Sequence, residues 1–238
     1  MRAAGRAVRF AFDAMKRAVR PGITTRELDE IGAEALAERG ARSAPQAFYD
    51  FPGATCISLN EEAAHGIPGD RRLVAGDLIN IDVSAVLDGY VADMGQSFAV
   101  TEASPAQRRL VEAVERAVHS AMSVMVADAP LNVIGATVSR LAAETGYRII
   151  ENLGSHGLGR SLHEPPSYVP IDNPSDRRVL DEGLVLTLEP FFSDRARWVE
   201  EASDGWTLEV PKGVLVAQYE HTFVIQRDAP PLVVTAAA

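Results

Sequence analysis

Two helical patterns open the chain. Apolar residues recur at helical spacing from Arg2 to Arg20, with basic residues between them, and Pro21-Gly22 ends this pattern. The next segment begins with Thr24-Thr25-Arg26-Glu27, in which a hydroxyl residue is followed three positions later by glutamate, the signature of a capping box. The sequence therefore predicts a first helix over residues 2–20 and a second that ends at Gly40.

Strand patterns follow these helices. Residues Ala54–Leu59 have the composition of a short strand, and residues Asp77–Val100 alternate on both sides of Asp88-Gly89. An Asp-Gly pair between two alternating runs is the strongest short-range signal for a β-hairpin with a two-residue turn. We therefore expect a long hairpin in this region.

The order of elements is then repeated. Helical patterns cover Pro105–Ala127 and Leu131–Thr145, Gly146 ends the second of them, and strand-like segments follow. The tripeptide Ile31-Gly32-Ala33 has a faint counterpart in Ile134-Gly135-Ala136. The repetition suggests two similar α+β halves.

No linker or low-complexity segment divides the two patterns. With 238 residues, 47% of them apolar, the chain is long enough to bury a substantial core. We expect one domain over residues 1–238, with halves of about 1–103 and 104–238.

Composition narrows the choice of compartment and chemistry. No stretch approaches the length of apolar sequence that spans a bilayer, and the mean hydropathy is −0.01, so a cytoplasmic protein is expected. The single cysteine, Cys56, excludes an intramolecular disulfide framework and any cysteine-rich zinc site. Metal ions would have to be bound by His, Asp and Glu.

The charge balance argues against general nucleic-acid binding. The formal net charge is −10, whereas nucleic-acid binding relies on Lys and Arg to neutralise phosphates. Residues 1–20 are an exception, because six basic side chains stand against Asp13 and give the segment a net charge of +5. The simplest interpretation is the solvated face of the first helix, and the alternative is a basic patch that makes transient contact with the ribosome.

Two aspartates are expected to converge on the hairpin. A two-residue turn at Asp88-Gly89 places Ser84 opposite Asp93 and Asp82 opposite Gly95, so that Asp82 is the diagonal same-face neighbour of Asp93. Such neighbours have backbones roughly 7 to 8 Å apart. A solvated face is the ordinary interpretation of an acidic pair, but apolar residues alternate with the carboxylates here, so both faces look covered. Two buried like charges would need a cation.

Two histidines follow in a segment rich in glycine and proline. His156 is flanked by glycines in Gly154-Ser155-His156-Gly157, and His163 comes seven residues later. Glycines allow the backbone to approach a site closely and leave the imidazole projecting, as a metal ligand or a general acid or base requires. A lone histidine in a strand is more often a core residue, but this pair in this setting indicates function.

Two glutamates end or interrupt apolar strands. Glu189 closes the run Leu184–Leu188, and Glu220 lies in the middle of a predicted strand over Val214–Ile225. A buried carboxylate must be protonated, ion-paired or bound to metal, because leaving it unpaired costs several kcal/mol. An arginine partner is the alternative to a metal. Four carboxylates and one imidazole would suit two Mn(II), Fe(II), Co(II) or Zn(II) ions, and such a pair of ions activates water and polarises a carbonyl for amide hydrolysis.

These motifs resemble those of the methionine aminopeptidases of the short bacterial type, and the similarity runs through nearly the whole chain. The aspartates of the Asp-Gly hairpin, the His-Gly-Leu-Gly-Arg segment, Leu-Glu-Pro and Ala-Gln-Tyr-Glu-His-Thr all match motifs of that family. The resemblance implies five metal ligands at Asp82, Asp93, His156, Glu189 and Glu220.

The resemblance also implies the residues around the substrate. His65, in His-Gly-Ile-Pro, and His163 would stabilise the tetrahedral intermediate and hold the peptide. The methionine side chain would enter a shallow apolar pocket that includes Cys56, Phe51 and Trp206. Cys56 is interpreted as a small pocket residue and not as a nucleophile, because no histidine is obviously paired with it.

The implied fold and activity are specific. The fold would be the α+β pita-bread (creatinase/aminopeptidase) fold, with pseudo-two-fold halves, a central antiparallel sheet and two divalent metal ions in the cleft. The chain would act as a monomer on the N-termini of nascent or newly made polypeptides, and remove methionine preferentially when the second residue is small. A metal-bridging hydroxide would attack the scissile carbonyl, with Glu189 as the proton shuttle.

Two alternatives share this fold. Xaa-Pro aminopeptidases and prolidases have the same ligand set but usually carry an additional N-terminal domain, and some members have become non-catalytic binding proteins that typically lose ligands. Three positions depart from the usual family pattern, namely Ala92, Met94 and Ser155. They put fine specificity in doubt more than activity. His119 and His221 are expected to lie outside the site.

Overall fold

The computed structural model describes residues 1–237, so residue 238, the last of the expected domain, lies outside the described range. The first part of the chain forms α1 (Arg2–Ala18), α2 (Thr25–Glu38), β1 (Arg42–Ser43), α3 (Ala44–Tyr49), β2 (Cys56–Leu59), β3 (Glu62–Ala64), β4 (Leu78–Leu87) and β5 (Tyr90–Ala99). The second part forms α4 (Pro105–Met122), α5 (Asn132–Thr145), β6 (Arg148–Ile149), β7 (Ser155–Gly157), β8 (Glu164–Tyr168), β9 (Val185–Leu188), β10 (Phe191–Ser193), β11 (Glu200–Glu201), β12 (Leu208–Glu209), β13 (Val216–Gln218), β14 (His221–Val224) and β15 (Leu232–Val233).

The predicted capping box at the start of α2 is confirmed. The Thr24 hydroxyl accepts a hydrogen bond from the Glu27 N–H at 3.1 Å, and the Glu27 carboxylate accepts one from the Thr24 N–H at 2.7 Å. These two bonds satisfy backbone donors that a helix N-terminus otherwise leaves unpaired. Both predicted N-terminal helices are found, and they end at Ala18 and Glu38, each two residues before the predicted end.

The predicted hairpin is confirmed in its turn and in its register. Asp88 and Gly89 have φ angles of 51° and 74°, the left-handed conformations that a type I′ turn requires. Ser84 lies opposite Asp93 and Asp82 lies opposite Gly95. On its other edge β4 pairs with β2 and then β1.

The third predicted helix ends earlier than expected. The pattern extends to Ala127, but α4 stops at Met122. The Ser123 hydroxyl donates to the Ser120 carbonyl within the last turn, and the Ala127 N–H donates to the Gln226 carbonyl, outside the helix. The chain therefore leaves the helix because a tertiary partner takes up its backbone groups. The following helix, α5, ends at Gly146 as predicted.

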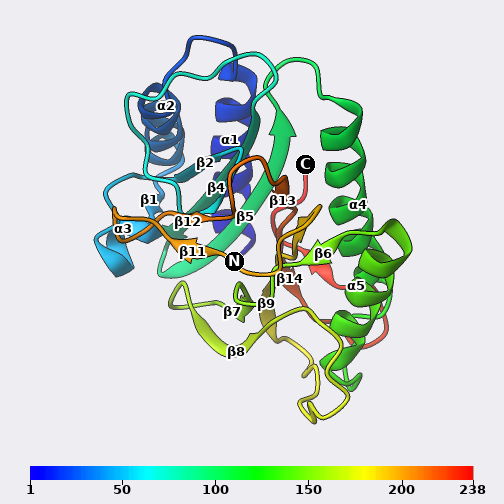
Figure 1. Ribbon diagram of the computed structural model, residues 1–238. Coiled ribbons are helices and arrows are strands. Elements are labelled where there is room, and N and C mark those ends of the chain that lie inside the picture. The colour runs from blue at the N-terminus through cyan, green and yellow to red at the C-terminus, as the bar shows by residue number, and fades with distance from the viewer. Residues whose placement is uncertain (238) are drawn as a thin grey trace.

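A mixed set of antiparallel sheets completes the fold. The largest has the strand order β15-β14-β9-β7-β8, and two smaller sheets have the orders β13-β10-β6 and β11-β12-β3. Figure 1 shows α1 and α2 beside the β4–β5 hairpin and α4 and α5 on the other side of the molecule. Two of the apolar cores follow this division, since one joins α1 and α2 to β4 and β5 and another joins α4 and α5 to β9 and β14.

The prediction of one continuous strand over Val214–Ile225 is wrong. The chain forms β13 beside β10, leaves that sheet at Tyr219 and Glu220, and joins β9 as β14. At the crossing, Tyr219 forms an antiparallel bridge with Gln96, and the Glu220 N–H donates to the Gly95 carbonyl at 2.7 Å. The hairpin therefore contacts the strands of the second part of the chain through its second strand, β5.

Within the described residues 1–237, no helix is both long enough and apolar enough to cross a membrane.

Candidate active site

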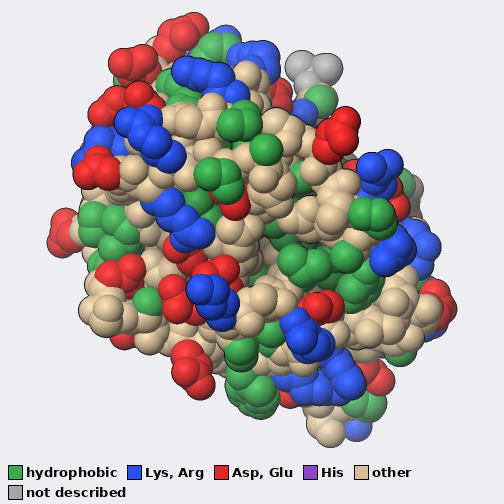
Figure 2. Space-filling model, turned by 45° about the horizontal axis from the view of Figure 1, so that its top comes forward, with side chains coloured by type: hydrophobic (Ala, Val, Ile, Leu, Met, Phe, Trp, Pro, Cys, Tyr) green, Lys and Arg blue, Asp and Glu red, His purple; other side chains and the backbone are tan. Residues whose placement is uncertain are grey.

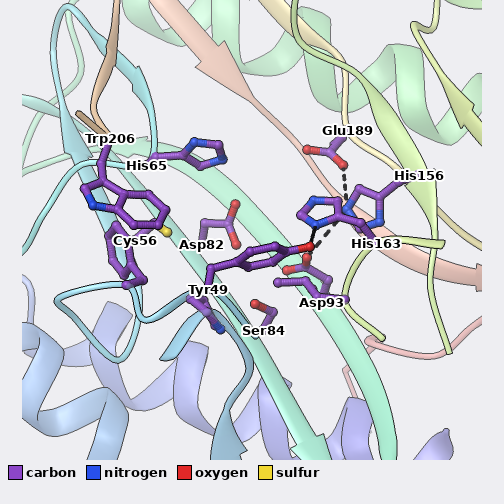
Figure 3. A pocket seen from close by; sticks show the side chains of 13 residues that line it. Tyr49, Cys56, His65, Asp82, Ser84, Asp93, His156, His163, Glu189 and Trp206 are labelled. Atoms are coloured by element: carbon purple, nitrogen blue, oxygen red, sulfur yellow. Dashed lines mark hydrogen bonds and ion pairs between the residues drawn. The ribbon is translucent and has the colours of Figure 1, made fainter. Parts of the chain in front are cut away.

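A cavity of about 280 Å³ lies between the hairpin and the strands of the second part of the chain. Figure 3 shows Asp93, His156, His163 and Glu189 at one end of it, Trp206, Cys56 and His65 at the other, and Asp82 between them. Its lining residues are Pro45, Tyr49, Phe51, Cys56, His65, Asp82, Ser84, Asp93, His156, Leu162, His163, Glu189 and Trp206. Every residue singled out from the sequence for a site role lies on this wall except Glu220, which lies behind it and is only 1% exposed.

The two hairpin aspartates meet at the base of the cavity. Asp82 comes from β4 and is half-buried, whereas Asp93 comes from β5 and is buried. Burial raises the pKa of Asp82 to about 6, and burial together with the charges of Asp82 and Glu189 raises the pKa of Asp93 well above its usual range. A cation between these groups would offset the cost of burying their charged forms and the repulsion that Asp93 experiences from Asp82 and Glu189.

His156 presents an unprotonated nitrogen to the acidic groups. Its Nδ1 lies 2.9 Å from the Gly157 carbonyl oxygen, which can only accept, so the proton of the neutral ring is on Nδ1. The lone pair of Nε2 then faces Glu189 Oε1 at 3.4 Å and Asp93 Oδ2 at 3.9 Å. Desolvation lowers the pKa of His156 to about 4, so the ring is neutral, which is the form that binds metals.

Asp93, His156 and Glu220 together form a buried group that fits a metal ion. Each offers one ligand atom, and the three atoms lie within 4.8 Å of one another. Asp93 Oδ1 and Glu220 Oε1 are buried and have no hydrogen-bond partner among residues 1–237. Unsatisfied carboxylate oxygens beside a histidine lone pair are unfavourable without a cation. The donor set therefore fits a divalent metal.

The alternative of an arginine partner is not supported. Within the described chain, the arginine ion pairs go to carboxylates outside this cavity, such as Arg9 with Asp13 and Arg178 with Asp176. Burial and the charges of Asp93, Glu189 and Asp82 raise the pKa of Glu220 well above its usual value.

Glu189 extends from the end of β9 into the cavity. The Thr187 hydroxyl accepts a hydrogen bond from the His156 N–H at 3.0 Å and lies 2.8 Å from Glu189 Oε1, to which it donates. Ser155, one of the three departures from the family pattern, accepts a hydrogen bond from the Glu189 N–H at 3.1 Å. Burial and the charge of Asp82 raise the pKa of Glu189 to about 8, the range of a group that exchanges protons near neutral pH.

Gln218 was not assigned a role from the sequence. Its amide nitrogen donates to Glu220 Oε2 at 3.1 Å and lies 3.4 Å from Glu189 Oε2, while its amide oxygen accepts from Asn80 at 2.8 Å. Asn80 donates to the oxygen of the Gln218 amide, so the NH₂ group at the other end of that amide faces the carboxylates. The sequence signal that could have identified Gln218 is its position two residues before Glu220, which places both side chains on the same face of a strand.

Gly95 makes room for this group. It lies opposite Asp82, as the hairpin register predicted. A Cβ at Gly95 would lie 2.4 Å from Gln218 Oε1 and 2.9 Å from Glu220 Oε2. The glycine therefore allows β5 to approach the carboxylates of the second part of the chain.

The aromatic end of the cavity contains Phe51, Trp206 and Cys56. The rings of Phe51 and Trp206 meet edge to face, with centroids 5.2 Å apart. Burial and the charge of Asp82 raise the pKa of the Cys56 thiol well above its usual value, so it remains protonated and is a poor nucleophile.

His65 and His163 reach the cavity from loops. His65 has a φ of 56°, an uncommon conformation for a residue with a side chain, and Gly66 packs so closely on β2 that a Cβ there would lie 2.3 Å from the Ile57 carbonyl oxygen. Desolvation lowers the pKa of both His65 and His163. His163 also contacts Tyr49, a cavity residue that the sequence reasoning missed.

The remaining sequence features lie away from the cavity. Ala92 and Met94 are fully buried in the core beneath α1. His119 is exposed on α4, and His221 is hydrogen-bonded to Thr235. The departures at Ala92 and Met94 are therefore packing changes beneath the hairpin.

Comparisons with known proteins agree with this geometry. Residues 1–227 match the sequence pattern of metallopeptidase family M24. The chain is 44% identical to methionine aminopeptidase 2 of Bacillus subtilis over 228 residues, which is 95% of this chain and 92% of that protein. The crystal structure of methionine aminopeptidase from Rickettsia prowazekii superposes with a TM-score of 0.94 at 30% identity, over 99% of this chain and 95% of that one.

A more distant structure shares the fold. Prolidase from Pyrococcus furiosus superposes with a TM-score of 0.79 at 22% identity, over all of this chain but only 63% of that one. The expected pita-bread fold with antiparallel sheets is confirmed. The chain belongs to metallopeptidase family M24, among its methionine aminopeptidases.

Proposed function

We propose that this protein removes the N-terminal methionine from polypeptides, using two divalent metal ions held in the cavity. The observation that carries the metal is the pair of unpartnered oxygens, Asp93 Oδ1 and Glu220 Oε1, beside the Nε2 lone pair of His156 among residues 1–237. The sequence similarity to methionine aminopeptidases supports the substrate.

Five side chains would hold the metal ions, namely Asp82, Asp93, His156, Glu189 and Glu220. Four carboxylates offer more oxygens than one ion can bind, and a carboxylate with two free oxygens can bridge two ions. An oxygen-rich set with one imidazole suits Mn(II), Fe(II), Co(II) or Zn(II). Divalent ions in such a site lower the pKa of water and polarise a peptide carbonyl.

The protein's own groups would position the peptide and move its protons. In the hydrolysis, the oxygen of water bonds to the carbonyl carbon of the first residue, the C–N bond breaks, and a proton must reach the leaving nitrogen. Glu189 is suited to carry that proton, because its carboxyl lies at the cavity beside the other candidate metal ligands. His65 and His163 would hydrogen-bond the peptide carbonyl groups.

The apolar end of the cavity supports methionine as the first residue. Phe51, Trp206 and Cys56 would surround an unbranched thioether, and sulfur packs well against aromatic rings. A preference for a small second residue follows if Tyr49 and His163 narrow the cavity beyond the scissile bond. The free α-amino group would lie at the acidic end.

The alternatives have weaker support. The prolidase is only 22% identical, so it supports the fold alone. A non-catalytic binding protein would not need to retain all of the candidate donors at Asp82, Asp93, His156, Glu189 and Glu220.

The test is to incubate metal-reconstituted protein with the peptides Met-Ala-Ser and Ala-Pro-Ala and to follow release of the first residue. We expect methionine release that Asp93→Ala and His156→Ala both abolish. Release of alanine from Ala-Pro-Ala would favour a proline-specific enzyme. No cleavage with Mn(II), Fe(II), Co(II) or Zn(II) would favour a binding protein.

The proposed setting is the cytoplasm, with nascent chains as partners of a monomeric, single-domain enzyme. Basic side chains of α1, including Arg2, Arg6 and Arg17, are exposed and are proposed to contact the ribosome transiently. Figure 2 shows a face on which basic and acidic side chains are interspersed. Salt screens exposed charges, so the basic residues of α1 would attract ribosomal RNA only at short distance. Replacing these three arginines by glutamate should reduce cosedimentation with ribosomes at low salt and leave peptide cleavage unchanged.

A further inference from the structure

Tyr49 reaches across the mouth of the cavity to His163. It is the last residue of α3, and its hydroxyl oxygen lies 2.5 Å from His163 Nδ1. Figure 3 shows the tyrosine side chain extending over the hairpin strands toward the two histidines. The contact joins residues 114 positions apart in the chain, so it depends on the docking of α3 against the β7–β8 loop.

The direction of this hydrogen bond depends on the tautomer of His163, because the tyrosine oxygen and the ring nitrogen can each donate or accept. Desolvation raises the pKa of Tyr49, so the phenol keeps its proton at neutral pH. Donation from the tyrosine to His163 Nδ1 would leave the ring proton of a neutral His163 on Nε2, whereas donation from Nδ1–H to the tyrosine oxygen would leave Nε2 without a proton.

A second contact limits the rotation of the His163 ring. It lies tilted against the ring of His156, with centroids 4.2 Å apart and an interplanar angle of 54°, and the Tyr49 ring is tilted against it with centroids 5.3 Å apart. Together these contacts restrict the orientation of the imidazole.

We propose that Tyr49 is a positioning residue, which holds His163 in the Nε2–H form so that Nε2–H can donate to a carbonyl oxygen of the bound peptide. This inference rests on the proposed aminopeptidase function for the role of His163. The tautomer itself does not depend on that function, so the two can fail separately.

The tautomer can be read directly by nuclear magnetic resonance. In metal-free protein with ¹⁵N-labelled histidine, the two ring nitrogens of His163, assigned with His163→Gln, should show a single Nε2–H form. Tyr49→Phe removes only the hydroxyl and should convert this pattern into a mixture of both tautomers. An unchanged pattern in Tyr49→Phe would overturn the proposal.

Tyr90→Phe is the matched control. Its hydroxyl accepts a hydrogen bond from Arg160 at 3.0 Å, in the same loop that carries His163, but Tyr90 lies outside the cavity lining. We expect the control to leave the His163 pattern unchanged. An equal change in both variants would show a general loosening of the loop and would overturn the proposal.

Kinetics provide the second readout. Tyr49→Phe should lower kcat/KM for Met-Ala-Ser by up to about tenfold, the effect of losing one hydrogen bond, with the same division between kcat and KM as His163→Gln. The double variant should be no worse than His163→Gln alone, because Tyr49 acts through that histidine. Additive losses would overturn the proposal. If no variant and no wild-type protein cleaves the peptide, the proposed function fails while the resonance experiment still decides the tautomer.

Discussion

The two parts of the chain supply the candidate metal donors in different ways. Asp82 and Asp93 lie on the two strands of a single hairpin, and the turn at Asp88-Gly89 sets their register. His156, Glu189 and Glu220 come from three separate short segments around β7, β9 and the crossing between β13 and β14. Local turn chemistry fixes the first pair, whereas the second group depends on tertiary hydrogen bonds through Thr187, Ser155 and Gln218.

This contrast predicts that the most damaging small change is at the contact between the two groups. Gly95→Ala adds a methyl group 2.4 Å from Gln218 Oε1 and 2.9 Å from Glu220 Oε2, so both side chains must shift. Of the two, Glu220 is a candidate metal ligand. We expect metal affinity, measured by calorimetry with Mn(II), to fall about 100-fold, at the upper end of effects seen around metal ligands.

Gly76→Ala is the matched control for that substitution. Gly76 has a φ of 89° and no neighbouring atom within 4 Å of an added Cβ, so the change strains a turn away from the site. Stability should fall by about 1 kcal/mol with unchanged metal affinity. Equal metal affinities in Gly95→Ala and wild type would contradict the assignment of Glu220.

A smaller effect is expected at Gln218, which contacts the donors of the second part of the chain, Glu189 and Glu220. Gln218→Leu removes the amide that donates to Glu220 and lies near Glu189, without removing a candidate donor. Metal affinity should fall about 10-fold, within the range for residues that orient metal ligands. Asn80→Ala, which removes the donor that orients the Gln218 amide, should have a weaker effect in the same direction. Unchanged affinity in Gln218→Leu would show that the carboxylates need no such support.

The smallest predicted effect is a dependence of stability on pH in metal-free protein. Carboxyls with raised pKa values bind protons more tightly in the folded state than in the unfolded state, so stability falls as pH rises toward the folded pKa. His156 and His221, with pKa values lowered to about 4, act in the opposite direction, but only below their unfolded value near 6.5. Between pH 6.5 and about 8 the histidines no longer oppose Glu189, and the opposing group that remains is the Met1 amino group, whose pKa burial lowers.

The free energy of unfolding of EDTA-treated protein should fall across that window by up to about 1.4 kcal/mol per pH unit for each proton released. Saturating Mn(II) should reverse the trend, because metal binds the deprotonated carboxylates. Glu189→Gln should flatten the metal-free profile. A metal-free stability that rises between pH 6.5 and 8 would contradict the raised pKa of Glu189.

Much of the fold and the site could be predicted from the sequence, for reasons that differ by region. The capping box at Thr24 and the turn at Asp88-Gly89 are local signals, and both are found as expected. The end of α4 and the break at Tyr219 were missed, because tertiary partners at Gln226 and Gln96 decide them. Gln218 and Tyr49 were missed as site residues for the same reason, since their partners are distant in the chain.

The link between β5 and the crossing strands has a consequence for biosynthesis. The Thr222 hydroxyl hydrogen-bonds both the N–H and the carbonyl of Asp93, at 2.9 and 2.8 Å, so the last donor-bearing segment to leave the ribosome closes on the hairpin made much earlier. A chain synthesised only through β5 carries Asp82 and Asp93 but none of the other three candidate donors. With these candidate donors, loading with metal would be coupled to completion of the chain, and an unfinished copy of the enzyme would not be an active peptidase.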